Sequence, residues 1–125
     1  MNIVILRGVL SRPAEQRMLP SGDVIVAYEV RIAHEDGPAD SVPVVWSAPV
    51  GRGLHDAGEE VVVTGRVRRR FYRAGGATQS RTEVVAEGVV PRRATKRVAR
   101  LVGDALAAAD HALPADRGRA SRARG

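Results

Sequence analysis

The sequence predicts an all-β domain that is followed by one helix and a basic tail. Five runs rich in Val and Ile lie between Gly, Pro or polar turn signals, at residues 2–10, 24–32, 42–48, 60–72 and 82–90. From Thr95 onward the apolar residues instead recur every three or four positions, which is the period of a helix. A chain of 125 residues with 44% hydrophobic content fits one domain with a core of its own.

The run at 24–32 is the clearest strand. Its residues alternate with a period of two, which suits a half-buried strand, and one face carries Val24, Val26, Tyr28, Val30 and Ile32. Residues 19–22, Leu-Pro-Ser-Gly, predict a turn before it. Residues 54–57 are expected to form one helical turn, and residues 73–80, which contain Gly75 and Gly76, a mobile hairpin loop.

The C-terminal third divides into a helix at 92–113 and a tail at 114–125, after an N-terminal domain at 1–91. The helix has one apolar stripe: Val98, Leu101, Val102, Ala105, Leu106, Ala109 and Leu113. Because an isolated helix of this length is marginal in water, the stripe is expected to dock. Pro114 is expected to end the helix, and the tail, with no apolar residue larger than Ala, is expected to be disordered.

The positive charge is confined to that C-terminal third. Residues 1–90 hold eleven Arg and eleven acidic residues, whereas residues 91–125 hold eight Arg, one Lys and three Asp and so carry the whole excess of +6. A segment of this kind favours an anionic partner, nucleic acid before a membrane surface. The alternative is a tail that only keeps the protein in solution. Five cations crowd the start of the helix: Arg92, Arg93, Lys96, Arg97 and Arg100.

Cellular location follows from two further features of the sequence. There is no cysteine, which favours an intracellular protein without disulfides or thiolate metal sites. The apolar first ten residues are too short for a secretory signal and contain Arg7, and no run approaches the roughly 20 apolar residues that cross a bilayer. The expectation is a cytoplasmic, nucleoid-associated protein that does not insert into membranes.

The residues offer little for catalysis, and we expect neither an enzyme nor a cofactor. His34, His55 and His111 lie in three different regions, and no Ser/His/Asp set or Gly-rich phosphate loop is recognisable. His34, Glu35 and Asp36 with Asp40 form the one cluster that could hold a divalent ion. We interpret it as a solvated loop and predict no metal site.

The fourth run carries the main functional signal. Alternation places Arg66, Arg68, Arg70 and Tyr72 on one face, and Val61, Val63, Val67 and Phe71 on the other. Three like charges at two-residue spacing repel one another, so the face makes most sense when phosphates neutralise it, with the Tyr72 ring as a platform for a base. The alternative is a solvated edge strand that uses Arg to discourage aggregation.

Trp46, the only tryptophan, lies in the third run. Val42, Val44, Trp46 and Ala48 share one face, and Pro43, Val45 and Ser47 the other, but alternation does not reveal which face is inside. A lone Trp in a β-protein is more often core than a ligand platform.

Three separated motifs resemble the bacterial single-stranded DNA-binding protein family. The N-terminal segment matches through Gly8, Leu10, Glu15, Arg17, Pro20, Ser21 and Gly22. GEEVVVTGRVRRRFY resembles the fourth strand of the family, and TEVVAEGV its closing strand. The resemblance covers residues 1–90 and implies a five-stranded Greek-key barrel of the OB-fold, a homotetramer, and single strands held by base stacking and phosphate contacts.

The resemblance makes Trp46 and Tyr72 stacking residues, which reverses the core interpretation of Trp46. The whole expected nucleic-acid-binding set is Trp46, Arg66, Arg68, Arg70, Tyr72, Arg73, Arg17 and Arg31. The implied role is sequence-independent binding of single-stranded DNA in replication, repair or recombination.

Two departures from the family pattern qualify that role. Asp36 and Asp40 lie near positions where many members carry further tryptophans, so binding is expected to rely on arginines and to weaken steeply with salt. The chain ends in basic residues rather than an acidic tip, so recruitment of repair enzymes through such a tip is not expected and a paralogue is favoured. The alternatives are an accessory module that binds RNA or a replication protein, and a purely structural oligomerising barrel.

Overall fold

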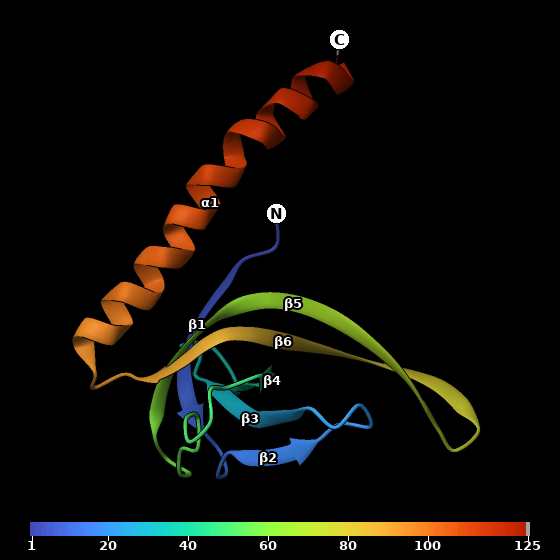
Figure 1. Ribbon diagram of the computed structural model, residues 1–125, viewed down its shortest axis with the longest axis vertical. Coiled ribbons are helices and arrows are strands. Elements are labelled where there is room, and N and C mark those ends of the chain that lie inside the picture. The colour runs from blue at the N-terminus through green and yellow to red at the C-terminus, as the bar shows by residue number, and fades with distance from the viewer. Residues whose placement is uncertain (125) are drawn as a thin grey trace.

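The computed structural model describes the backbone of residues 1–124 and the side chains of residues 1–111. Within this part, six strands form one curled sheet and a single helix follows them (Figure 1). The elements are β1 Val4–Leu10, β2 Glu15–Met18, β3 Val24–Ile32, β4 Asp40–Trp46, β5 Glu60–Ala74, β6 Ala77–Pro91 and α1 Thr95–Arg124. The predicted mainly β domain with a C-terminal helix is confirmed, but the number of five strands is wrong.

The sheet closes into a barrel-like ring. The strand order is β1-β5-β6-β4-β3-β2, and β1 also pairs with β3 through Val9 and Leu10. All pairings are antiparallel except β4 with β6, which run parallel. The residues that point into the ring form the core and are almost all aliphatic: Leu10, Val26, Tyr28, Val30, Val44, Val61, Val63, Val84, Ala86 and Val89. The face predicted from the alternation of 24–32 is therefore the buried one.

Strand β2 escaped prediction because its sequence, EQRM, has no β-branched or aromatic residue and all four side chains are exposed. The segment is extended because it pairs with β3, from Glu15 opposite Ala27 to Met18 opposite Val24. The predicted turn at 19–22 joins the two strands. Gly22 has a φ of 92°, and its N–H donates to the Leu19 carbonyl oxygen at 2.8 Å.

The long hairpin β5–β6 replaces the loop that was expected at residues 73–80. Only Gly75 and Gly76 lie between the strands, with φ values of 60° and 78°, the left-handed pair that a tight two-residue hairpin turn requires. Figure 1 shows the hairpin arching past the rest of the sheet to this turn. The helical turn expected at 54–57 is also absent, because its backbone bonds elsewhere: the His55 carbonyl accepts from Ala14 N–H at 2.8 Å.

Helix α1 docks on the outside of β5 and β6, as its apolar stripe predicts. Leu101 lies against Gly88, where an added Cβ would come within 2.5 Å of a Leu101 methyl carbon. Further along, the stripe leaves the sheet: Leu106 is 55% exposed, and the side chain of Leu113 lies outside the described residues.

The sequence places the end of the helix at Pro114, whereas the backbone of the structure is helical to Arg124. Of the segment expected to be a disordered tail, 114–125, all side chains and the backbone of residue 125 lie outside the described residues. Within the described residues, no helix is both long and apolar enough to cross a membrane.

Candidate nucleic-acid interface

The arginine row on β5 projects from the outside of the sheet. A bulge at Thr64 and Gly65 resets the register, and beyond it Arg66, Arg68, Arg70 and Tyr72 lie opposite Val85, Glu83, Arg81 and Gln79 of β6. Paired residues point to the same side of a sheet, and Val85 in turn lies beside Val45 of β4. The row therefore shares one outer face with β6 and β4. The predicted alternation is correct, and the side chains of Arg68 and Arg70 are 43% and 53% exposed.

The buried carboxylate of Glu83, on β6, lies beside the arginine row. The sequence alone did not identify this residue. Glu83 is 1% exposed and accepts a hydrogen bond from Arg68 Nη2, while its Oε1 lies 4.0 Å from Arg70 Nη1. The Glu83 carboxylate thus compensates the charge of two guanidinium groups, those of Arg68 and Arg70, and holds both in position. The signal was present in the sequence: partners in the hairpin are symmetric about Gly75–Gly76, which puts Glu83 opposite Arg68.

Arg81 is the second missed residue. It lies directly opposite Arg70, and like charges in that position destabilise a sheet unless an anion compensates them. The Arg70 guanidinium carbon is also 5.9 Å from the centre of the Tyr72 ring, a cation–π distance. Arg70, Arg81 and Tyr72 thus form a cationic group with an aromatic ring on the outer half of the hairpin.

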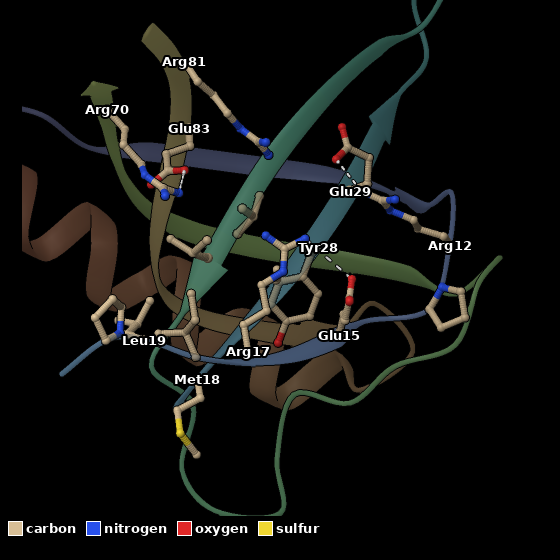
Figure 2. A pocket seen from close by; sticks show the side chains of 16 residues that line it. Arg12, Glu15, Arg17, Met18, Leu19, Tyr28, Glu29, Arg70, Arg81 and Glu83 are labelled. Atoms are coloured by element: carbon tan, nitrogen blue, oxygen red, sulfur yellow. Dashed lines mark ion pairs between the residues drawn. The ribbon is translucent and has the colours of Figure 1, made fainter. Parts of the chain in front are cut away.

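A groove of about 250 Å³ runs from this hairpin to β2 and β3. Figure 2 shows Arg70, Arg81 and Glu83 on one side and Arg12 and Glu29 on the other. Arg17 of β2 also lines it and pairs with Glu15 at 3.5 Å, as Arg12 does with Glu29 at 3.6 Å. The groove therefore brings Arg17 and Arg70, both predicted site residues, to one depression.

An adjoining hollow of about 260 Å³ is lined by both apolar and charged residues. Arg68, Arg70 and Glu83 are its charged residues, Ser47 is polar, and the remaining lining is apolar: Leu19, Ile25, Val45, Trp46 and Val85. Trp46 comes from the other side of its strand, because it pairs with Val26 and lies beside Ala86, both core residues. It is partly buried against the core, and since β4 ends at Trp46 the residue also lines this hollow.

Four of the predicted site residues line neither the groove nor the adjoining hollow: Arg31, Arg66, Tyr72 and Arg73. Arg66 instead lines a separate hollow with Ile3 and Leu101. Arg31 is near the end of β3, opposite Ser41, and lines neither hollow. Arg73 donates through Nη2 to the Gly76 carbonyl oxygen at 2.9 Å, so it closes the hairpin turn. In the loop with His34, Glu35, Asp36 and Asp40, which we interpret as solvated, His34 Nε2 contacts Asp40. Within the described residues no group of three or more metal-ligating side chains occurs.

Comparison with protein families and with curated proteins finds no match. The resemblance to single-stranded DNA-binding proteins therefore rests on the three sequence motifs.

Proposed function

We propose that the chain binds single-stranded DNA without sequence preference, through arginine–phosphate contacts and base stacking, as a non-enzymatic protein of DNA replication, repair or recombination. The observation that carries the proposal is a hollow that combines apolar residues with two arginines of the row. Unpaired bases can enter this hollow, which is lined by Ile25, Val45 and Trp46, while Arg68 and Arg70 contact the backbone. A duplex keeps its bases stacked inside and offers such a hollow nothing to bind.

The strand arrangement supports assignment to the OB-fold. If β2 is treated as an added edge of β3, the other five strands follow the ring β1-β3-β4-β6-β5 and back to β1. This order supports a small Greek-key sheet, the kind whose outer strands and loops bind single strands in OB-fold proteins.

Assembly into a homotetramer belongs to the same proposal, and the partly unpaired edge of β1 supports it. One edge of β1 pairs with β5, whereas the other reaches β3 only through Val9 and Leu10. Ile3, Ile5 and Val9 are exposed on this segment at 37%, 41% and 38%. An open edge with apolar side chains favours pairing with a second copy. The mass of the native protein in solution checks it.

Binding of fluorescently labelled oligo-dT, measured by anisotropy at several salt concentrations, tests the proposal. We expect oligo-dT to bind more tightly than a duplex of equal length. Arg66→Ala should lower the slope of log affinity against log salt by about 0.7, one phosphate contact on a single strand. Tyr72→Ala should cost about 1–3 kcal/mol. Arg31→Ala is the matched control and should change neither quantity. Equal affinity for duplex, or tighter binding to structured RNA, would refute the proposal.

A further inference from the structure

Trp46 borders two further hollows, on the side of the molecule where α1 begins. The first, of about 360 Å³, lies between the loop after β4 and the helix and is lined by Trp46, Arg52, His55 and Arg97. The second, of about 210 Å³, contains Trp46, Arg52 and Arg97 again, with Arg100 and Leu101. One residue, Trp46, thus lines the hollow of the arginine row and both hollows beside the helix.

The arginines of this second region are exposed and uncompensated. Within residues 1–111, the ion pairs include none of Arg52, Arg97 and Arg100. The nearby carboxylate Glu59 is already engaged, by His55 at 2.7 Å and by Arg93 at 3.5 Å. Glu87 and Asp104 line the second hollow but form no ion pair with these arginines.

The position of these cations is fixed by the fold. Gly53 approaches so closely that a Cβ there would lie 3.2 Å from Trp46 Cε3, which sets the loop carrying Arg52 against the ring. Leu101 docks on Gly88 one turn after Arg97 and so fixes the face of α1 that looks toward Trp46. The first turn of α1 contains no acidic residue, so the positive end of the helix dipole adds to the potential.

We propose that α1 belongs to the nucleic-acid interface: a single strand held by the arginine row continues past the end of β4, stacks a base on Trp46, and places its next phosphates against Arg52 and Arg97. The inference rests on the proposed function and extends it, because it makes the C-terminal helix a contact for the same strand. The site size is then larger than the row on β5 alone provides. This path accounts for the unpaired arginines beside α1 and for the position of Trp46 at three hollows.

The test compares two oligo-dT lengths on the full chain, about 5 and about 20 nucleotides, which lie near and beyond the limits of a single OB-fold site. The variant is Arg52→Ala/Arg97→Ala. Its control is Arg31→Ala/Lys96→Ala, which has the same net charge and removes cations that line none of these hollows. We expect the first double variant to lose about tenfold or more in affinity for the long oligonucleotide, and about 1.4 in salt slope for two lost contacts. Its affinity for the short one should match the control.

Fluorescence of Trp46 gives a second readout, since the chain has no other tryptophan. Quenching by the long oligonucleotide should be weaker in Arg52→Ala/Arg97→Ala than in the control. If the two double variants bind the long oligonucleotide equally while Arg66→Ala weakens binding of both lengths, the path over α1 is wrong and the function stands. If the unmodified protein binds neither length, both proposals are wrong.

Discussion

Glu83 determines how the arginine row behaves as a chemical unit. A carboxylate that is 1% exposed would be costly if left alone, so Arg68 and Arg70 stabilise it as much as it positions them. Arg66, further along the same face, forms no ion pair within the described residues. Neighbouring arginines in one row therefore differ: Arg68 contributes to folding as well as to the site, whereas Arg66 has no ion-pair partner within the described residues.

This difference predicts the stability of two variants. Arg68→Ala should lower the unfolding free energy by about 1–3 kcal/mol, because it removes the hydrogen-bond donor of a buried carboxylate while Arg70 remains. Arg66→Ala should change it by less than about 0.5 kcal/mol. Urea unfolding measures both values. Adding Glu83→Gln to Arg68→Ala should restore part of the loss, and equal stability of the two single variants would contradict the role of Glu83.

Tyr28 is a second buried polar residue, and within the described residues its hydroxyl has no hydrogen-bond partner. Burial raises the pKa of Tyr28 above its ordinary value of 10.0. The folded chain thus keeps this proton at a pH where the unfolded chain loses it, and the unfolding free energy falls as the pH rises above 10.0.

Tyr28→Phe should stabilise the protein by about 1 kcal/mol at neutral pH, because it removes an unsatisfied buried group. It should also remove the part of the stability loss above pH 10.0 that belongs to this residue. Thermal unfolding followed by circular dichroism between pH 7 and 11 measures both effects. Tyr72→Phe, at an exposed position, is the control and should leave neutral-pH stability unchanged. A destabilised Tyr28→Phe would show that the hydroxyl is satisfied.

Among the elements, β5 depends most on one local irregularity. At the bulge, a Cβ on Gly65 would lie 2.1 Å from the Val85 carbonyl oxygen, a clash with backbone that no rotamer change relieves. Gly65 is also where the buried part of the strand ends and the exposed row begins. The bulge needs glycine because the strands β5 and β6 approach closely here.

Gly65→Ala should therefore destabilise the protein by about 2 kcal/mol or more, the range of backbone strain and disrupted pairing. Gly37→Ala is the matched control: nothing lies within 4 Å of a Cβ there, and its φ is not in the left-handed region. It should be neutral within about 0.5 kcal/mol. Melting temperatures of the two variants check the contrast, and equal values would mean that the bulge can move to another residue.

Strand periodicity made much of this architecture predictable. The alternation of 24–32 gave the correct faces, because apolar burial determines which side of a strand turns inward. In 66–72 the alternation separates two faces, but both are exposed, and the expected burial of Val67 and Phe71 is wrong. Strand β2 was not predictable, since pairing with β3 rather than its own side chains makes it extended. Arg81 and Glu83 became visible only once the Gly75–Gly76 turn set the register of the hairpin.

The placement of Trp46 illustrates the limit of alternation for the site. Its strand is apolar on both faces, so a period of two cannot identify the inner one. The structure turns Trp46 toward the core side and still leaves it at the border of three hollows, because β4 ends there. Alternation within β4 could not predict this position, because it depends on the loop that carries Arg52 and on helix α1, which lie outside the strand in sequence.

Across the whole molecule, α1 is a basic segment that is attached to a nearly neutral domain. Its attachment depends on few contacts, with Leu101 against Gly88 as the central one. Leu101→Ala should lower the unfolding free energy by about 1–2 kcal/mol, less than for a fully buried leucine, and should expose the 92–95 junction to protease. Leu106→Ala, one turn away and 55% exposed, should have neither effect. Limited proteolysis with mass spectrometry distinguishes the two, and equal cleavage would mean that α1 is held by other contacts.

The register shift between β5 and β6 at Thr64 and Gly65 also separates two tasks along β5. Residues 61–65 are buried and hold the ring together, whereas residues 66–74 are exposed on an arm supported mainly by β6. Except at Arg68 and Arg70, which pair with the buried Glu83, substitutions on that arm should leave the interior untouched. The arm can therefore diverge, or be redesigned by grafting, toward other polyanions at little thermodynamic risk to the scaffold that carries it.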